Sequence, residues 1–332
     1  MSKKLFTPGD LYWMVVWLVK KIYYSTLPIP ALLRLARWKG RFRFYRSEEP
    51  FRVRKNLLAY YGDSTTEQEI QVMVRRYFEF VEEYELTFRL PKLKRFSRIQ
   101  QWPLEGRHHL DAALARGKGA IVLITHFGYT RLIKYFLKMN GYKIAVVGSQ
   151  SSKRQKAEKK AKKRRQHYTA FRQFLYKRLR VSADVADERD LVADLNIRPL
   201  VQVLKNNGIL VIDGDAQHAV SFANLPFLGQ VYPFPTGFMK IALGNGAPIL
   251  PTFAVEAAVG LGMKVVIEPA LELEKNGTAE SAESTVSNNI QRFARIFESY
   301  VRRYPYLYKI WTKENWSEEK LARSRKELAK RF

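Results

Sequence analysis

His126 stands out among the five histidines of the chain because of its place in the sequence. It ends a continuous apolar run, GAIVLITH at 119–126, and Phe127–Gly128 and a helical pattern follow it. In open α/β sheets, ligands bind in the crevice outside the carboxyl ends of the strands. An imidazole at such a place can act as a general base that takes the proton of a hydroxyl group. The alternative is a structural histidine, which is the commoner role of a lone histidine at a strand end.

Two carboxylates follow a second apolar run of the same kind. Asp213 and Asp215 bracket Gly214 at the end of GILVID, residues 208–213. A glycine between them allows the backbone to pass close to a ligand. These carboxylates are candidates to support an imidazole, and the alternative is that they only cap the turn after their strand.

Three further positions are candidates for binding an anion. Thr236–Gly237 begins a predicted helix, whose free N–H groups could hold a phosphate or a developing oxyanion; the alternative for Thr236 is an ordinary N-cap. Arg198 precedes the 208–213 run and is a candidate phosphate contact. A metal or nucleotide cofactor is not expected, because no His, Asp or Glu cluster has ligand spacing and no phosphate-binding glycine loop is present. The absence of cysteine excludes disulfides and thiol catalysis.

The elements that must position these residues follow from the alternation of apolar runs and helical patterns. Continuous apolar runs are typical of buried parallel strands, and Thr66 with Glu69 has the pattern of a capping box that opens a helix. The fold class predicted is α/β, with a mostly parallel central sheet flanked by helices and a helical N-terminal region. The predicted strands are 119–126, 143–148, 208–213, 247–255 and 264–270, and the predicted helices are 66–90, 108–116, 130–139, 153–165, 196–206, 236–245, 284–303 and 315–331.

The N-terminal segment has the composition of a membrane interface. Residues 11–33 are rich in Trp, Tyr and aliphatic side chains, but Lys20 and Lys21 interrupt them, and each would cost about 2.5–3.5 kcal/mol near the centre of a bilayer. Pro28 and Pro30 should end the helix, and no cleavage site of a signal peptide is visible. We therefore expect interfacial or shallow re-entrant attachment, the alternative being a helix packed on the domain. The predicted division is 1–45 as this interfacial segment, 46–316 as the α/β domain and 317–332 as a charged C-terminal helix.

The charge of the chain points to an anionic partner. Its 58 Lys and Arg exceed its 31 Asp and Glu, which gives a net charge of +27. Residues 151–180 hold 13 basic side chains and one acidic side chain, so a net +12 lies there and +15 is spread over the rest. Nucleic acid, an anionic membrane and a phosphorylated substrate are the partners that such charge favours. A nucleic-acid binder should also carry a recognisable binding motif, and none is visible.

A set of short motifs occurs in a characteristic order along the chain. They are RKNLLAYYGDSTTEQEI at 54–70, THFG at 125–128, KNNGILVIDGD at 205–215, LPFLGQVYPFPTG at 225–237, GAPILPTF at 246–253 and YPYLYKIWTKENW at 304–316. In this order the sequence resembles the bacterial lipid A biosynthesis (lauroyl/myristoyl) acyltransferases, within the lysophospholipid acyltransferase-like group. The resemblance covers roughly residues 50–316, so the α/β domain is expected to be acyltransferase-like.

The resemblance implies a catalytic motif of a histidine followed five positions later by Asp or Glu. His126 would deprotonate the acceptor hydroxyl, and the acid would orient the imidazole. Here Arg131 occupies the acidic position. An arginine beside the ring should lower the pKa of His126 by like-charge repulsion. Three alternatives remain open: Asp213 or Asp215 replaces the acid, His126 acts alone, or catalysis is lost while binding persists. Arg131 itself is a candidate contact for a phosphate or for the phosphopantetheine arm of the donor.

The function expected from the resemblance is membrane-associated acyl transfer. The donor would be an acyl thioester of acyl carrier protein or coenzyme A, and the acceptor a hydroxyl of an anionic glycolipid or phospholipid, as in lipid A and lipopolysaccharide synthesis. The expected location is the cytoplasmic face of the bacterial inner membrane, with the membrane surface as a partner and no nucleic acid. The alternative is an inactive relative that binds lipid or a partner protein.

Overall fold

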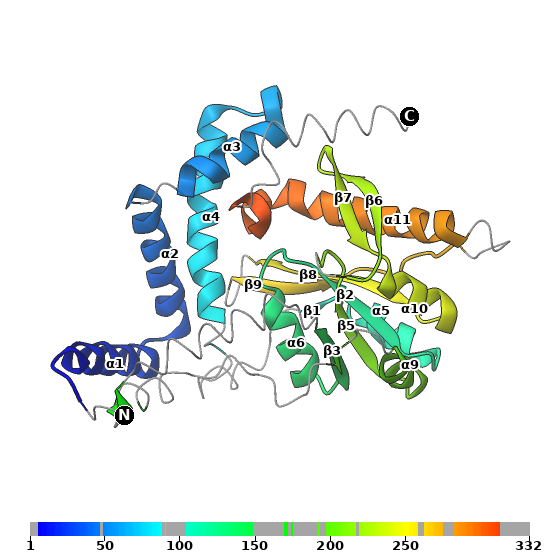
Figure 1. The fold of residues 1–332 in the computed structure, drawn as a ribbon, viewed down its shortest axis with the longest axis horizontal. Helices are drawn as coiled ribbons and strands as arrows, with labels where there is room; N and C mark the ends of the chain where they lie inside the picture. The colour runs from blue at the N-terminus through cyan, green and yellow to red at the C-terminus, as the bar shows by residue number, and fades with distance from the viewer. Residues whose placement is uncertain are drawn as a thin grey trace.

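The computed structural model describes residues 6–46, 49–87, 90, 104–148, 169–171, 174, 191–192, 197–216, 219–257, 262–274 and 282–312. The basic run 153–165 and the predicted C-terminal helix lie outside these residues. Within them the predicted fold class is confirmed: a mostly parallel sheet is flanked by helices, and helices precede it (Figure 1).

Four helices form the N-terminal region: α1 (Gly9–Thr26), α2 (Ile29–Arg46), α3 (Glu49–Tyr61) and α4 (Glu67–Thr87). The first helix ends before Pro28 as expected, and a second helix then begins, which the sequence analysis did not predict. The capping box at the start of α4 is confirmed, because the backbone N–H of Thr66 donates to Glu69 at 2.8 Å and that of Glu69 to the Thr66 hydroxyl at 3.3 Å. Among the described helices, none is long and apolar enough to span a bilayer.

Helices α2 and α4 lie side by side (Figure 1), held by an apolar seam and a row of ion pairs. Three carboxylates of α4 that are buried or nearly so receive cations of α2: Glu83 pairs with Arg37, Glu82 with Lys39 and Arg43, and Glu79 with Arg41. These pairs satisfy carboxylates that burial would otherwise penalise. The pairs therefore fix α2 against α4.

The sheet has seven strands among the described residues, in the order β1-β9-β8-β2-β5-β3-β4. Its central strands are continuous apolar runs, and β2 is buried along its whole length, which matches the prediction of parallel strands covered on both faces. Among the neighbouring pairs of these seven strands, β8 and β9 alone are antiparallel, so that β1 and β9 run opposite to the other five. The strands are β1 (Leu104–Glu105), β2 (Ala120–Ile124), β3 (Ile144–Gly148), β4 (Leu191–Val192), β5 (Ile209–Asp213), β8 (Ile249–Glu256) and β9 (Met263–Ile267).

Helices cover the sheet as predicted. The helix α11 runs along one side of it, and α6 lies on the other side (Figure 1). The helices of this region are α5 (Arg107–Ala115), α6 (Thr130–Met139), α9 (Arg198–Lys205), α10 (Gly237–Asn245) and α11 (Ala282–Arg303), and the short 3-10 turns η1 (Gly62–Ser64), η3 (Pro305–Leu307) and η4 (Lys309–Thr312) complete the described elements.

A separate antiparallel hairpin of β6 (Phe222–Phe227) and β7 (Gln230–Pro235) was not predicted. Its three prolines argue against strands in a sheet interior. They are tolerated because a two-stranded ribbon has free edges.

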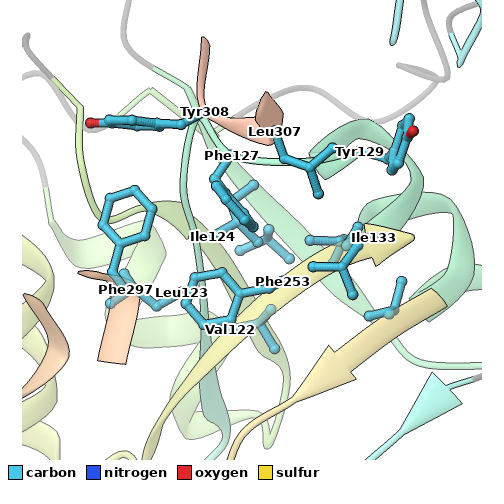
Figure 2. Close-up of a cluster of buried hydrophobic side chains, with 14 of the residues drawn as sticks. Val122, Leu123, Ile124, Phe127, Tyr129, Ile133, Phe253, Phe297, Leu307 and Tyr308 are labelled. Carbon is cyan, nitrogen blue, oxygen red and sulfur yellow. The ribbon is translucent and has the colours of Figure 1, made fainter. Parts of the chain in front are cut away.

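An aromatic core packs at the carboxyl end of β2, directly after His126. Figure 2 shows Phe127, Phe253 and Phe297 in one cluster, with Leu307 and Tyr308 packed against Phe127 from the C-terminal segment. Phe127 meets Phe253 and Phe297 edge to face, with ring centroids 6.0 and 6.1 Å apart. Because Phe127 is fully buried, this cluster anchors the backbone that carries His126.

Candidate active site

Strand register brings His126 opposite Asp215. The parallel strands β2 and β5 pair residue for residue with a constant offset, so that Ala120 faces Ile209 and Ile124 faces Asp213. Two residues beyond each strand, the same offset of 89 positions joins His126 to Asp215. The pair is therefore a continuation of the sheet, although the two residues are far apart in sequence.

Asp215 holds both the backbone and the ring of His126. The backbone N–H of His126 donates to both carboxylate oxygens at 3.0 Å, and ring Nδ1 lies 2.9 Å from Oδ1. A carboxylate only accepts hydrogen bonds, so Nδ1 carries the hydrogen and Nε2 is left as the second ring nitrogen. Asp215 is fully buried, whereas 48% of the His126 side chain is exposed. The ring is thus anchored on one side and accessible on the other.

The charge of Asp215 sets the protonation of His126. The neighbouring carboxylate raises the pKa of His126 to about 9, helped by the hydrogen bond and opposed by burial. The expected lowering of this pKa is wrong, because Asp215 is in direct contact with the ring. Lys309 is a cation that acts in the opposite direction. Below about pH 9 the ring of the free protein is therefore mainly an imidazolium ion.

Asp213 lies at the same strand end in a different role. Asp213 is the last residue of β5, and it pairs with Ile124, the last residue of β2. Burial raises the pKa of Asp213, while His126 and Lys134 act in the opposite direction. The direct contact to the imidazole comes from Asp215.

The turn after His126 is tied to the neighbouring elements. Gly128 has φ +64°, and a Cβ there would lie 1.9 Å from the carbonyl oxygen of Ala254, so only glycine fits. Tyr129 follows, fully buried, and donates its hydroxyl to Glu83 of α4 at 2.7 Å. Burial raises the pKa of both Tyr129 and Glu83. Because Glu83 also pairs with Arg37, helices α2 and α4 are connected to the histidine turn.

The segment that holds η3 and η4 closes over this turn. Phe127 forms a bridge with Tyr308, the N–H of Gly128 donates to the carbonyl of Leu307 at 2.9 Å, and the N–H of Lys309 approaches the carbonyl of His126 at 3.5 Å. The amide of Asn56 in α3 donates to the carbonyl of Trp311. Lys309 is thereby fixed beside His126.

Arg131 turns toward an aromatic ring of α4. Its guanidinium carbon lies 4.1 Å from the ring centroid of Tyr84, and burial lowers the pKa of Arg131 to about 10. The Nζ of Lys309 lies 2.8 Å from the same centroid, and burial together with the charge of Arg131 lowers the pKa of Lys309 well below its usual value. Two cations therefore share the Tyr84 ring.

The other predicted anion contacts lie at helix starts. Thr236 stands at the N-cap position of α10, but its hydroxyl pairs with that of Ser221 at 2.5 Å and makes no capping bond. Gly237 has open space where a Cβ would be. Arg198 is exposed at the first turn of α9. Their roles in binding stay predictions. No group of three or more metal-ligating side chains occurs in the part of the chain that the structure describes.

Sequence reasoning left the choice between Asp213 and Asp215 open, although one signal could have decided it. The two apolar runs each begin at a glycine, Gly119 and Gly208, and aligning these glycines pairs His126 with Asp215. Tyr84 and Lys309 were missed as site residues. Of the two, only Lys309 lies in a motif that the sequence analysis had singled out, YPYLYKIW.

Comparison with known proteins defines the class. Residues 2–317 match the family model described as bacterial lipid A biosynthesis acyltransferase. The chain belongs to this family, and it is an acyltransferase.

Curated relatives agree with this assignment. The phosphatidylinositol mannoside acyltransferases of Mycobacterium tuberculosis strains CDC 1551 / Oshkosh and ATCC 25618 / H37Rv are each 24% identical to it over 257 residues. These residues are 76% of this chain and 75% of each relative.

Proposed function

We propose that this protein transfers a fatty acyl chain from a thioester to a hydroxyl group of an anionic glycolipid or phospholipid, with His126 as the general base. The observation that carries the proposal is the 2.9 Å contact between His126 Nδ1 and the buried carboxylate of Asp215. It supplies from another strand the acid that the family motif would have at position 131. The description of the family names lipid A and the names of the relatives mention phosphatidylinositol mannoside, and both support a lipid acceptor.

The reaction needs one proton acceptor and returns one proton. Neutral His126 takes the proton of the acceptor hydroxyl at Nε2, and the oxygen attacks the carbonyl carbon of the thioester. The tetrahedral intermediate collapses with cleavage of the C–S bond, and the imidazolium returns its proton to the thiolate. Asp215 keeps Nδ1 protonated and stabilises the imidazolium, as a carboxylate does behind a catalytic histidine. The donor in this proposal is an acyl thioester of acyl carrier protein or coenzyme A.

A test of the general base compares two histidines. The full chain is incubated with a labelled acyl thioester and vesicles of anionic phospholipid or glycolipid. His126→Ala should lower the transfer rate about 10²- to 10⁴-fold, while the same change at exposed His108 in α5 should leave it unchanged. Transfer at the wild-type rate by His126→Ala would refute the assignment. No transfer by the wild-type protein, with lipid binding retained, would favour the inactive alternative.

Attachment to a membrane is supported by the exposed face of α1. Six apolar side chains that recur with the three- and four-residue period of one helix face are more than 40% exposed along this helix. An amphipathic helix of this kind lies in the plane of the lipid headgroups, and the net charge of +27 favours an anionic surface. The proposed location is the cytoplasmic face of the bacterial inner membrane. The six residues are Leu11, Tyr12, Val15, Leu18, Val19 and Ile22.

Flotation with vesicles tests this attachment. Wild-type protein should float with anionic vesicles, and more weakly at high salt. Val15→Asp with Val19→Asp should reduce flotation, whereas Val72→Asp, an exposed valine of α4, should not. Equal flotation with neutral and anionic vesicles would count against the role of charge.

A further inference from the structure

The hairpin of β6 and β7 carries most of the motif LPFLGQVYPFPTG, residues 225–237, and lies outside the main sheet. It lies against α11 (Figure 1). Its two strands pair with each other and with no other described strand. The hairpin therefore acts on the rest of the domain through its side chains rather than through the strand ladder.

One of these side chains reaches the turn that holds the partner of His126. Tyr232 of β7 is 3% exposed, and its hydroxyl donates to the backbone carbonyl of Asp215 at 3.0 Å. Asp215 is itself fully buried and lies two residues beyond the end of β5. A buried carbonyl needs a hydrogen-bond donor, and at Asp215 the Tyr232 hydroxyl takes the place that a neighbouring strand would have.

The direction of the Asp215 carboxylate depends on the backbone that carries it. Both of its oxygens accept the backbone N–H of His126 at 3.0 Å, and Oδ1 also lies 2.9 Å from ring Nδ1. Just before Asp215, the N–H of Gly214 donates to the carbonyl of Ile124 at 2.7 Å. Just after its side chain, the Tyr232 bond holds the carbonyl. Two hydrogen bonds thus fix the turn from which the carboxylate points to the imidazole.

The hairpin is anchored firmly enough to hold this turn. The ring of Phe227 stacks on that of Phe297 in α11, with centroids 4.9 Å apart. The side-chain amide of Gln291, also in α11, donates to the carbonyl of Pro226 at 3.1 Å. The Tyr232 ring packs edge to face against Phe227, with centroids 5.6 Å apart. The hydroxyl of Tyr232 is therefore presented by a support that extends to the long helix behind the sheet.

We propose that Tyr232 is a positioning residue, which holds the backbone of Asp215 so that its carboxylate keeps His126 in place for proton transfer. The role rests on the proposed function, because Tyr232 acts on the base through Asp215. The charged groups that act on the ring are Asp215, Asp213 and Lys309. Removal of the Tyr232 hydroxyl leaves these charges in place, so an effect on the ring has to come from displacement of Asp215.

The first experiment follows the titration of His126 without turnover. The full chain is labelled with isotope-enriched histidine, the ring signals are followed by NMR against pH, and His126→Ala identifies the signal. The pKa of His126 is about 9 in wild-type protein. Tyr232→Phe keeps the aromatic ring and should lower this pKa by about 0.5 to 1 unit, the size expected for one hydrogen bond.

The matched control removes a tyrosine hydroxyl at the other end of the sheet. Tyr142 lies just before β3 and donates its hydroxyl to Asp111 at 2.6 Å. Tyr142→Phe therefore breaks a hydrogen bond far from the carboxyl ends of the strands. The pKa of His126 should stay at its wild-type value in this variant.

The same change in Asp215→Asn tests whether Tyr232 acts through the carboxylate. Once the charge at position 215 is gone, Tyr232→Phe should add no further displacement to the pKa of His126. An equal displacement with and without the carboxylate would overturn the proposal. A pKa of His126 that is unchanged by Tyr232→Phe in the otherwise wild-type protein would overturn it as well.

A second variant covers the case in which Tyr232→Phe does not fold, which circular dichroism and thermal melting would show. Gln291→Leu removes the amide that ties the hairpin to α11 and leaves Tyr232 and Asp215 intact. It should lower the pKa of His126 in the same direction by a smaller amount. A wild-type pKa in folded Gln291→Leu would then overturn the proposal.

The second experiment measures kcat/KM against pH with a labelled acyl thioester. In Tyr232→Phe the rise of the rate should occur at lower pH, and the plateau should fall about tenfold or more because the base is held less well. Tyr142→Phe should follow the wild-type curve. An unchanged curve in Tyr232→Phe would overturn the positioning role. A displaced NMR titration without transfer by wild-type protein would instead place the failure in the proposed function.

Discussion

Replacement of Asp215 by asparagine separates the charge of this residue from its shape. The asparagine side chain could still accept the backbone N–H of His126 through its amide oxygen, but the negative charge beside the ring would be gone. In the wild-type protein this charge is the largest cause of the pKa of about 9 at His126, against an ordinary value of 6.5. The change therefore tests whether the carboxylate controls the base.

The expected size of the effect follows from that difference. The full shift is about 2.5 pKa units, or about 300-fold in the acid dissociation constant. Because 48% of the His126 side chain is exposed, solvent screens part of the attraction, and we expect a displacement of about 1 to 2 units. The plateau rate should also fall about 10²- to 10⁴-fold, since an amide can hold the ring in the wrong tautomer.

The assay is the dependence of kcat/KM on pH, with labelled acyl thioester and corrected for spontaneous hydrolysis. For wild-type protein the rate should rise with pH toward about 9, because the base must be neutral. In Asp215→Asn the rise should occur at lower pH. Asp213→Asn is the matched control: this carboxylate is a smaller cause of the pKa of His126, so its removal should displace the curve less. An unmoved curve in Asp215→Asn, or a larger displacement in Asp213→Asn, would refute the reasoning.

Two further predictions concern stability. The pKa of His126 is higher in the folded than in the unfolded chain, so the stability that this pair contributes is fully present below about pH 6.5 and is lost as pH rises through about 9. Urea unfolding at several pH values should show this loss in wild-type protein but not in His126→Gln; equal pH dependence in both would contradict it. Tyr129→Phe removes one of the hydrogen bonds of buried Glu83 and should lower the free energy of unfolding by about 1–3 kcal/mol. Tyr135→Phe, a half-buried tyrosine of α6, is the comparison, and an equal loss there would count against a special role of Glu83.

The sheet could be predicted from the sequence because its strands are short apolar runs bounded by glycines and helical patterns. The runs at 119–126 and 208–213 both became strands with close to the expected bounds. The hairpin of β6 and β7 was missed because Pro226, Pro233 and Pro235 count against strands. These prolines are acceptable because each of the two strands pairs with the other alone, so that its outer edge needs no hydrogen-bond donors.

The candidate site could be predicted in part. The position of His126 at a strand end and the presence of a carboxylate on a neighbouring strand end followed from local patterns. The choice of Asp215 depends on register between strands 89 residues apart, for which the glycines that open the two runs were the local signal. The approach of Arg131 and Lys309 to Tyr84 depends on how three separate segments fold together, and no local pattern encodes it.

The bonds between the histidine turn and residues 305–312 have a consequence for biosynthesis. Gly128 and Phe127 reach their final contacts only with Leu307 and Tyr308, which the ribosome adds about 180 residues after His126. Folding during synthesis can assemble the early strands, but the geometry around the imidazole must wait until this late segment leaves the exit tunnel. A nascent chain released early would thus hold a nearly complete sheet in which the turn after His126 lacks its contacts to residues 307–309.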